Sequence, residues 1–587
     1  MNPWRDGLAA LADHAGDAFI LFFVIAWGIF IMRGILLRFF GDLLDEADVL
    51  SLSSAGWVLP VLLLSLLTLG ISILTSVAIG VVLTLALIFV PVFFFAGKRP
   101  DPFPSFASFA VLIPAVILRF AFIRDLVLPS YFDSAQHYRL INSFIESHRT
   151  GVPVIRIEGG YFHLGFHSII AGIAQFTGED VIDLMLVAGP LFLAFLPITF
   201  FFIVKRETNS LPAAILACLL AGFGFHMPAH LMNWGKYPAL LGLFCMSFVL
   251  ILAYLAYRNN SSLIRKSALI LLGFALPASI LIHSRTLIVY GLALIAAFLT
   301  AAWNRLRMPY RITGFIILVF LLLVEIFALQ NNSALETLLD GYLKNDSWIL
   351  FLVFLLAFFS AAHFTEPTFF LTAFLALCAF CLFFPVPLPG IGVQTLLDRP
   401  FVQMLAFIPL SLLGGLGFAG LIRTTARLFL KSKLMQPFAI FFVFGLVLLN
   451  TALHYDFHPS DCCRFVNRDD LAAFSWMDEF LPRDATVLIA STGLYVTAFE
   501  SPQVQTGVDA GIWIQPLLSR NVELTDSNIR FDQEDSHRTL CNRGVDYIYV
   551  GSTLQSFDAS QLESQPDRYL PSFILPTAKI YRLAECK

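Results

Sequence analysis

The sequence is poor in charged residues, and the two signs of charge nearly balance. Asp, Glu, Lys and Arg make up only 13% of its 587 residues, and the net charge is −4. An ordinary soluble protein carries about twice that share of charge. A strongly basic surface is excluded, so we expect no nucleic-acid partner. The sequence contains no recognisable phosphate loop, internal repeat or low-complexity segment, and we expect no cleavable signal peptide before the first apolar run, 17–39.

Cysteine is also scarce, and its eight residues fall into two groups. Four lie in apolar runs, where a buried thiol behaves as a small hydrophobic side chain: Cys218, Cys245, Cys378 and Cys381. The other four lie in the polar C-terminal part: Cys462, Cys463, Cys541 and Cys586. These four permit disulfides if that part faces an oxidising compartment. This polar part contains neither a CxxC pair nor a spacing of Cys and His typical of a zinc site.

Long apolar runs dominate the remaining sequence. Hydrophobic residues make up 58% of the chain, and the mean hydropathy is +0.79. This predicts a polytopic α-helical membrane protein with about 13–15 apolar segments. The candidate spans are 17–39, 54–73, 75–97, 105–123, 181–204, 211–227, 236–257, 267–284, 286–303, 311–330, 347–363, 367–386, 400–422 and 436–453. The run 163–177 is shorter than the roughly 20 residues that a crossing helix needs, so we expect it to lie in the interface.

The distribution of Lys and Arg among the short loops predicts the orientation. If successive spans cross the membrane in alternating directions, most of these Lys and Arg residues fall in cytoplasmic loops. The short loops on the opposite side hold only Lys236, Arg285, Lys344 and Arg399. The polar C-terminal part then lies outside the cell, in a multi-pass protein of the plasma (inner) membrane. We expect three parts: N-terminal transmembrane helices at 1–104, a transmembrane core at 105–455 with a large outer loop at 124–180, and an extracytoplasmic α/β domain at 456–587.

Polar residues gather on the expected outer face, and Asp133 is the first of interest. It precedes the amphipathic segment 134–148, and Gln136 stands three residues later, which is a capping-box pattern. Asp133 is therefore interpreted either as a helix cap or as a general base in a cleft. His137 lies one helical turn further on, where it assists Asp133 or is simply a polar residue at the rim.

A pair of histidines follows in the segment 159–176. His163 and His167 are four residues apart, which places both on one helix face and is compatible with a divalent metal. Asp133 or Glu158 is the candidate for a further metal ligand. The alternative is that the two histidines are polar residues of a wet interface and hold no metal.

Three cations are expected at the same depth, near the lipid headgroups. They are Lys236, Arg285 beside His283, and Arg399, while Arg119 lies about one turn below. Cations at this level can bind a phosphate or diphosphate through charge-assisted hydrogen bonds. Alternatively, each simply extends its charged end to the lipid headgroups.

Two stretches carry a resemblance to a known class of enzymes. "FDSAQHYRLINSFIESHRTG" (132–151) and "GGYFHLGFHSIIAGIAQFTGED" (159–180) precede a full span. The arrangement resembles the GT-C integral-membrane glycosyltransferases, which include protein O-mannosyltransferases, oligosaccharyltransferases and the lipid A aminoarabinose transferase. In that class, an outer loop carries an acidic motif before an amphipathic helix, and a second interfacial helix follows. Here Ser134 stands where a second acid is usual, and the proline of the second segment is absent.

The resemblance implies transfer of a sugar from a polyprenyl-phosphate donor in the membrane lipid to an acceptor outside the cell, which is a glycan, a lipid or a protein. Asp133 would act as general base, and Lys236, Arg285 and Arg399 or Arg119 would hold the phosphate. The substrate site would also include His137, Glu158, His163, His167 and His283. The competing hypotheses are a transporter or flippase of lipid-linked glycans and a non-catalytic accessory subunit.

Overall fold

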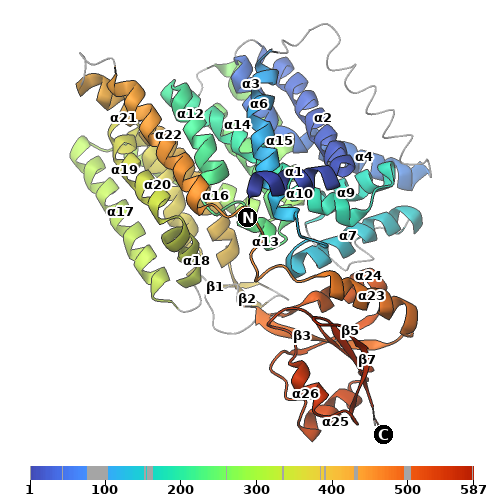
Figure 1. The fold of residues 1–587 in the computed structure, drawn as a ribbon. Helices are drawn as coiled ribbons and strands as arrows, with labels where there is room; N and C mark the ends of the chain where they lie inside the picture. The colour runs from blue at the N-terminus through green and yellow to red at the C-terminus, as the bar shows by residue number, and fades with distance from the viewer. Residues whose placement is uncertain are drawn as a thin grey trace.

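A helical membrane part and a smaller α/β domain make up the chain (Figure 1). The computed structural model describes residues 2–41, 44–75, 103–150, 152, 154, 163–258, 261–332, 336–383, 385–388, 392–428, 434–494, 504–584 and 586. The expected span 75–97 therefore lies almost wholly outside the described residues.

Within the described ranges, eight stretches of helix are long and apolar enough to cross a membrane. They are α2 (Ala15–Phe40), the run Val181–Thr208 that contains α10 (Val181–Phe195) and α11 (Phe201–Thr208), α14 (Tyr237–Arg258), α15 (Ser262–Ile282), α16 (Thr286–Asn304), α17 (Met308–Gln330), α21 (Arg399–Leu428) and α22 (Met435–His454). The sequence predicts all eight, and the expectation of a polytopic helical membrane protein is confirmed.

Several expected spans are bent or short. Residues 54–73 were predicted as one span, but α3 (Glu46–Gly56) and α4 (Val58–Thr75) meet there at about 40°. A second bent pair joins residues 338–345, which include the end of α18 (Glu336–Asp340), to α19 (Ser347–His363). Other helices of the membrane part are α6 (Phe103–Phe120), α12 (Leu211–Leu219), α13 (His230–Asn233) and α20 (Thr365–Phe380). A short hairpin, β1 (Pro385–Leu388) and β2 (Gly392–Thr395), precedes α21.

Two helices between α6 and α10 carry the motifs discussed above. These are α7 (Tyr131–Thr150) and α9 (Leu164–Thr177). At 1.5 Å per residue, the 14 residues of α9 extend about 21 Å, which is less than the thickness of a bilayer core. Gly178 ends α9 with a positive φ of 80°, and the Asp180 carboxylate caps α10 at once. The prediction that 163–177 is too short to cross agrees with this length.

Ion pairs group the loops at the end of the bundle that is remote from the α/β domain. Asp48 binds both Lys205 (3.2 Å) and Arg206 (2.8 Å). Arg258 binds Glu207 through its Nε (3.1 Å) and joins it to Glu366. The acidic start of α3 and two of the cationic loop segments, 205–206 and the one that contains Arg258, therefore share one end.

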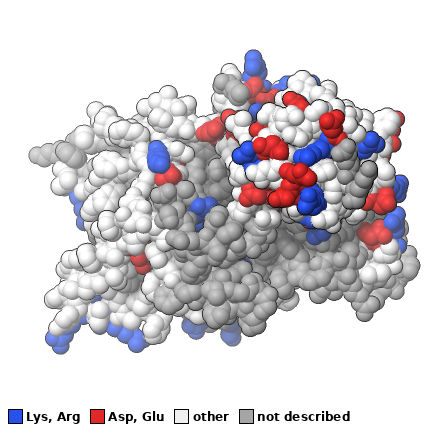
Figure 2. Space-filling model, turned by 90° about the horizontal axis from the view of Figure 1, so that it is seen from below, with Lys and Arg blue, Asp and Glu red and all other residues white. Residues whose placement is uncertain are grey.

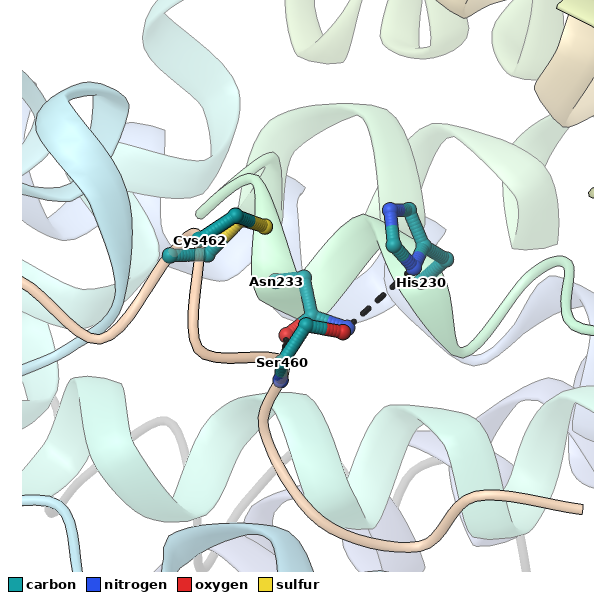
Figure 3. The surroundings of a disulfide bond; sticks show 5 residues. His230, Asn233, Ser460 and Cys462 are labelled. Carbon is teal, nitrogen blue, oxygen red and sulfur yellow. Dashed lines mark hydrogen bonds between the residues drawn. A yellow bond between two sulfur atoms is a disulfide. The ribbon is translucent and has the colours of Figure 1, made fainter. Parts of the chain in front are cut away.

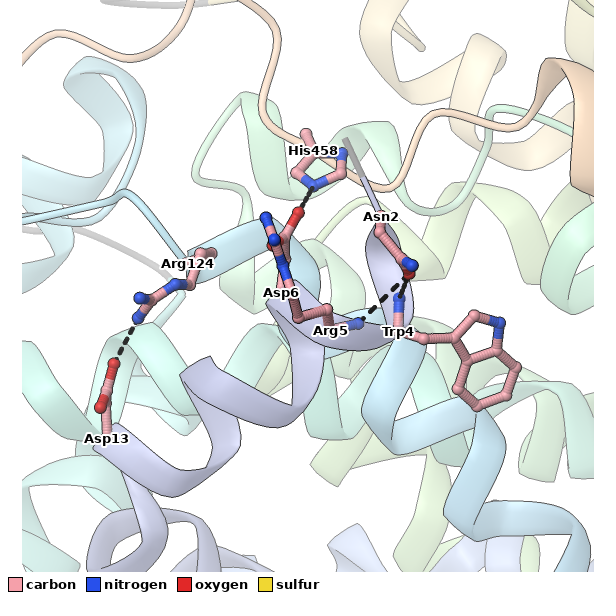
Figure 4. Close-up of polar contacts among 7 residues, drawn as sticks. All are labelled: Asn2, Trp4, Arg5, Asp6, Asp13, Arg124 and His458. Carbon is pink, nitrogen blue, oxygen red and sulfur yellow. Dashed lines mark hydrogen bonds and ion pairs between the residues drawn. The ribbon is translucent and has the colours of Figure 1, made fainter.

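The N-terminal helix α1 (Pro3–Asp13) contacts the linker after α22 and the segment before α7 (Figure 4). Asp6 binds His458, in the linker after α22, with 3.2 Å between Oδ2 and Nε2, and Asp13 pairs with Arg124. Gly7 allows close contact with α6, because a Cβ there would overlap the Ile117 carbonyl oxygen. The N-terminus thus lies on the same side of the bundle as the α/β domain.

The α/β domain is built on a six-stranded mixed sheet. Its strands are β3 (Thr486–Leu494), β4 (Val504–Gly507), β5 (Asn521–Asp526), β6 (Tyr547–Val550), β7 (Tyr569–Ile574) and β8 (Lys579–Leu583), and its helices are α23 (Arg468–Phe480), α24 (Ile514–Leu518), α25 (Glu534–Asn542) and α26 (Ala559–Glu563). The order is β4-β3-β6-β8-β7, and β5 and β6 both run parallel to β3. The predicted α/β fold is confirmed.

This domain packs on α7, as Figure 1 shows. Leu128 and Ala135 belong to the same buried cluster as Phe465 and Trp513 of the α/β domain, and the rings of Tyr138 and Trp513 are 5.8 Å apart. A separate core unites the membrane helices, from Ala10 to Val447. The helix that carries Asp133 is therefore held between two hydrophobic cores. The domain boundaries at 104 and 455 stay a prediction.

Two disulfides occur in the C-terminal part, Cys462–Cys463 and Cys541–Cys586. The four cysteines of the membrane helices are free thiols. Charged side chains also concentrate on this part, which Figure 2 shows from below beside a largely uncharged helical surface.

Candidate functional site

Asp133 pairs with Lys236 across two separate elements. The Lys236 Nζ donates to Asp133 Oδ2 at 2.8 Å, and both side chains are partly exposed, at 31% and 22%. The prediction that Asp133 caps its helix is wrong, because α7 begins two residues earlier, at Tyr131. Tyr131 has a positive φ of 67°, and its backbone N–H donates to the Cys463 carbonyl at 2.9 Å. Asp133 therefore lies in the first turn, with its carboxylate directed to a lysine.

Close packing between two turns brings this pair together. Gly235 has φ +62°, and a Cβ at this position would lie 2.7 Å from the Ser130 carbonyl oxygen and collide with the Ser134 hydroxyl. Only glycine combines this backbone conformation with such close approach. Gly235 thus lets the turn after α13 rest on the start of α7, which places Lys236 beside Asp133.

A second cation–carboxylate pair lies on the same rim. Arg285 donates to Asp398, and its guanidinium carbon lies 6.0 Å from the centre of the Phe401 ring. Asp398 also accepts the Phe401 backbone N–H at 2.9 Å, so it caps α21 with its other oxygen. Arg285 remains 32% exposed and can reach a ligand without leaving its loop.

The predicted histidines form two pairs rather than one set. His137 Nδ1 and His167 Nε2 are 3.0 Å apart, and both side chains are buried. His163 instead stacks on His283, with ring centres 4.2 Å apart, and accepts the Ser284 backbone N–H. The expectation of a shared helix face is wrong because α9 begins at Leu164, so His163 precedes the helix.

This arrangement bears on the metal hypothesis. Among the described residues, no group of three His, Cys, Asp or Glu side chains is placed to hold a metal ion. His163 and His167 turn to different partners, so they do not form a two-histidine site. Glu158, the other candidate ligand, lies outside the described residues.

Electrostatic interactions unite these residues around Lys236. Burial, reinforced by Lys236, lowers the pKa of His137 to about 3, and burial with Arg285 and Lys236 lowers the pKa of His163 to about 4. Burial also lowers the pKa of His283. These three imidazoles are therefore neutral near pH 7. Burial opposes the charge of Lys236, but Asp133 and Asp398 outweigh it and raise the Lys236 pKa.

Arg399 lies within reach of the same charges, since its guanidinium interacts electrostatically with Tyr131 and Asp398. The structure thus brings together eight predicted residues on one rim: Asp133, His137, His163, His167, Lys236, His283, Arg285 and Arg399. The ninth, Glu158, lies outside the described residues.

Arg119 does not belong to this group. It is 4% exposed, and it donates to the Gly222 carbonyl and to the Tyr455 hydroxyl, with its guanidinium near the Phe223 and Tyr455 rings. Its hydrogen bonds serve to join α6 to two other segments. The hypothesis that Arg119 holds a phosphate is therefore set aside.

The segment around the Cys462–Cys463 disulfide contacts both sides of the Asp133–Lys236 pair. On one side, the Ser460 backbone N–H donates to Asn233 at 2.8 Å, three residues before Lys236, and Asn233 also contacts His230 (Figure 3). Three residues later, Cys463 accepts the Tyr131 N–H. Sequence patterns gave no signal for these contacts, since they join segments more than 200 residues apart.

The sequence reasoning also missed the role of Asp398. Its signal was present, because an acid two residues before a proline that opens a helix is a typical N-cap pattern.

Comparisons with known proteins give the family of the chain. The model of a family described as "Family of unknown function (DUF6541)" matches residues 47–492. The chain belongs to this family. The matched DUF6541 segment contains all eight residues of the rim. No curated protein matches the chain. Among solved structures, the crystal structure of the Archaeoglobus fulgidus oligosaccharyltransferase in its apo form is similar at 13% identity, covering 77% of this chain and 70% of that chain, with a TM-score of 0.32. At this TM-score, the likeness carries no argument about function.

Proposed function

We propose that this member of the DUF6541 family is a membrane glycosyltransferase that moves a sugar from a polyprenyl-phosphate donor to an acceptor on the extracytoplasmic side. One observation carries the proposal. A partly exposed carboxylate, Asp133, lies 2.8 Å from Lys236 on a rim that also holds Arg285, Arg399 and neutral histidines. A base beside several cations is the set of groups that such a transfer needs.

Asp133 is the proposed general base. Its carboxylate takes the proton of an acceptor hydroxyl while the oxygen attacks the anomeric carbon of the sugar. The bond between that carbon and the phosphate oxygen breaks, and its electron pair leaves with the lipid phosphate. This single displacement inverts the anomeric centre and requires no protein nucleophile.

The cations are the proposed binders of the phosphate. The Lys236 and Arg285 side chains are each about one-third exposed, and each forms an ion pair with a carboxylate. A phosphate that enters between them offers more oxygens than one carboxylate and can share both cations. Such binding would draw Lys236 from Asp133 and leave the carboxylate free to accept a proton. Donor binding and activation of the base would thereby be coupled.

The histidines are proposed to position the sugar. A neutral imidazole offers one donor and one acceptor nitrogen, which suits a sugar hydroxyl. His163 forms the partly exposed edge of this group, whereas His137, His167 and His283 are buried and support it from behind.

Two features support the extracytoplasmic side. Disulfides occur only in the C-terminal part among the described residues, and disulfides persist in oxidising compartments. The end of the bundle that bears Asp48, Arg206 and Arg258 is the cationic one, which fits a cytoplasmic location. The candidate site lies at the other end, beside the α/β domain.

Mass spectrometry of polyprenyl-linked sugars and surface glycans, in cells with and without this protein, tests the proposal. We expect a lipid-linked sugar to accumulate without the protein and one sugar to be missing from a surface molecule. A flippase would instead leave the lipid-linked sugar trapped on the cytoplasmic leaflet, which lectin accessibility from the outside detects. Unchanged pools of both would contradict the proposal.

A further inference from the structure

A large cavity with mixed polar and apolar walls lies where the α/β domain meets the membrane part. Its volume is about 970 Å³, at the upper end of the range for ligand sites. Its walls come from the end of α1, the segment before α7, the linker around Cys462 and the loop that follows β6. Among the described residues, no Phe, Tyr or Trp side chain lines it.

The charges on its walls balance. They come from Asp13, Arg124, Asp125, Asp461, Arg464 and Arg468. Amide and hydroxyl groups of Asn467, Ser552, Thr553 and Gln555 stand between them. An arginine only donates hydrogen bonds and an ionised carboxylate only accepts them, whereas a sugar hydroxyl does both. Alternating donors and acceptors with no excess of one sign thus suit a neutral polyhydroxylated ligand better than a polyanion.

A second cavity continues the first on the other side of the loop 552–556. It has a volume of about 620 Å³ and shares Val508, Leu554 and Gln555 with the larger one. Its other walls include Thr492, Ser527 and Asn528, which lie at or just beyond the carboxyl ends of β3 and β5. Ligands commonly bind at this edge of parallel strands.

The sheet opens at this edge because β3 changes its neighbour. It pairs with β6 through Val487 and Leu488 but with β4 from Ser491 onward. Beyond the split, the buried Asp509 carboxylate accepts the Gly511 N–H at 2.9 Å and the Ser556 hydroxyl. These bonds hold the loop 552–556 as the wall between the two cavities.

The larger cavity is also joined to the helix of the candidate base. Cys462 lines the cavity, and the carbonyl of the next residue, Cys463, accepts the Tyr131 N–H at the start of α7. Leu126 and Val127 line it from the segment that leads into α7. A molecule in the cavity therefore lies beside the segments that position Asp133.

We infer that these two cavities bind the acceptor, and that the acceptor is a neutral carbohydrate chain. The inference rests on the proposed function and names its acceptor class. A lipid acceptor is disfavoured because charged, amide and hydroxyl side chains line both cavities, and a peptide is disfavoured because the described walls include no Phe, Tyr or Trp to receive its side chains. Two adjacent cavities that share Gln555 offer room for several sugar rings.

Photo-crosslinking in cells tests the inference on the full chain. Gln555, which lines both cavities, is replaced by p-benzoylphenylalanine, and the matched control carries the same residue at the exposed Glu479 of α23. After irradiation, we expect tandem mass spectra of the peptide that contains position 555 to show successive losses of sugar residues. Periodate, which cleaves vicinal diols, should degrade this adduct, and the control should lack it.

Three results would overturn the inference: no adduct above the control, an adduct that fragments into amino acids, or an adduct with a lipid. Repeating the capture with Asp133→Asn separates the two proposals. If the carbohydrate is captured but Asp133→Asn leaves the glycans unchanged, the site stands and the proposed reaction fails. If Asp133→Asn abolishes transfer but position 555 captures no carbohydrate, only the acceptor site fails.

Discussion

Lys236 reaches Asp133 from a turn that Gly235 packs directly against the start of α7. The two residues are separated by 103 positions in the chain, and each lies in a short segment held by the linker between Ser460 and Cys463. The α/β domain and the membrane helices thus contribute jointly to one ion pair. An exposed pair of this kind adds only about 0–1 kcal/mol to stability. The close packing that holds Lys236 beside Asp133 is therefore better explained by a function of the pair than by its contribution to folding stability.

Gly235→Ala should disturb this pair. The substitution forces an unfavourable positive φ, at a cost of about 1–2 kcal/mol, and drives a methyl group into Ser130 and Ser134. We expect sugar transfer to fall at least about tenfold, because the turn must shift and carry Lys236 away. Gly273→Ala is the matched control, since a Cβ there meets no atom within 4 Å. Equal activity of the two variants would contradict the assigned role of Gly235.

Arg285→Ala should weaken donor binding more than acceptor binding. A charged hydrogen bond contributes about 1.5–3 kcal/mol, so the KM for the lipid-linked donor should rise about ten- to a hundredfold. Lys344→Ala is the control, because Lys344 lies near the same rim but is 71% exposed and pairs only with Asp340 in the described contacts. Steady-state kinetics in detergent or vesicles measures both constants. Equal changes in the two KM values would make Arg285 a residue that merely reaches the headgroups.

Stability should decrease as the pH falls through the range set by the buried histidines. The pKa of His137 is about 3 in the folded chain and about 6.5 in the unfolded chain. Between about pH 6.5 and about pH 3, the imidazole is protonated in the unfolded state but stays neutral in the folded state. The free energy of unfolding therefore decreases as the pH falls through this range. His137→Gln should reduce the slope of the free energy of unfolding against pH by up to about 1.4 kcal/mol per pH unit. Thermal unfolding between about pH 7 and pH 4.5 checks this, and an unchanged slope would refute it.

The Cys541–Cys586 disulfide leads to one prediction about the stability of the α/β domain and one about the compartment that this domain faces. It closes a loop with a sequence separation of 45, which stabilises the fold by about 4 kcal/mol in the chain-entropy description. Cys541→Ser should therefore destabilise the α/β domain by about 2–4 kcal/mol. Non-reducing peptide mapping of protein from intact cells should recover the linked pair. Free thiols at both positions would place the domain in a reducing compartment and remove the support for the extracytoplasmic side.

Much of the architecture was predictable because its causes are local. The length of α9 and the polarity after residue 455 follow from short windows of sequence, and both agree with the structure. The start of α7 was not predictable. A capping pattern favoured Asp133, but the Tyr131 backbone N–H donates to the carbonyl of Cys463, 332 residues away, and Tyr131, with a positive φ, starts the helix earlier.

Most residues of the candidate site were predictable from the sequence, but the contacts between them were not. Alternation of the spans was enough to bring Lys236, Arg285 and the histidines to one rim. The partners depend on tertiary packing that a helical period does not encode. His163 stacks on His283 because α9 begins at Leu164, one residue after His163. His167 instead contacts His137 in the buried interior.

The most direct test of the central claim is single-turnover transfer by purified Asp133→Asn. Asparagine keeps the size of the side chain and can still accept a hydrogen bond from Lys236, so the fold should be retained. The substrate is the radiolabelled lipid-linked sugar that accumulates in cells without the protein. We expect release of the sugar from its polyprenyl phosphate to fall about 10²- to 10⁴-fold, with unchanged donor binding. Release at the wild-type rate by the folded variant would contradict Asp133 as the base.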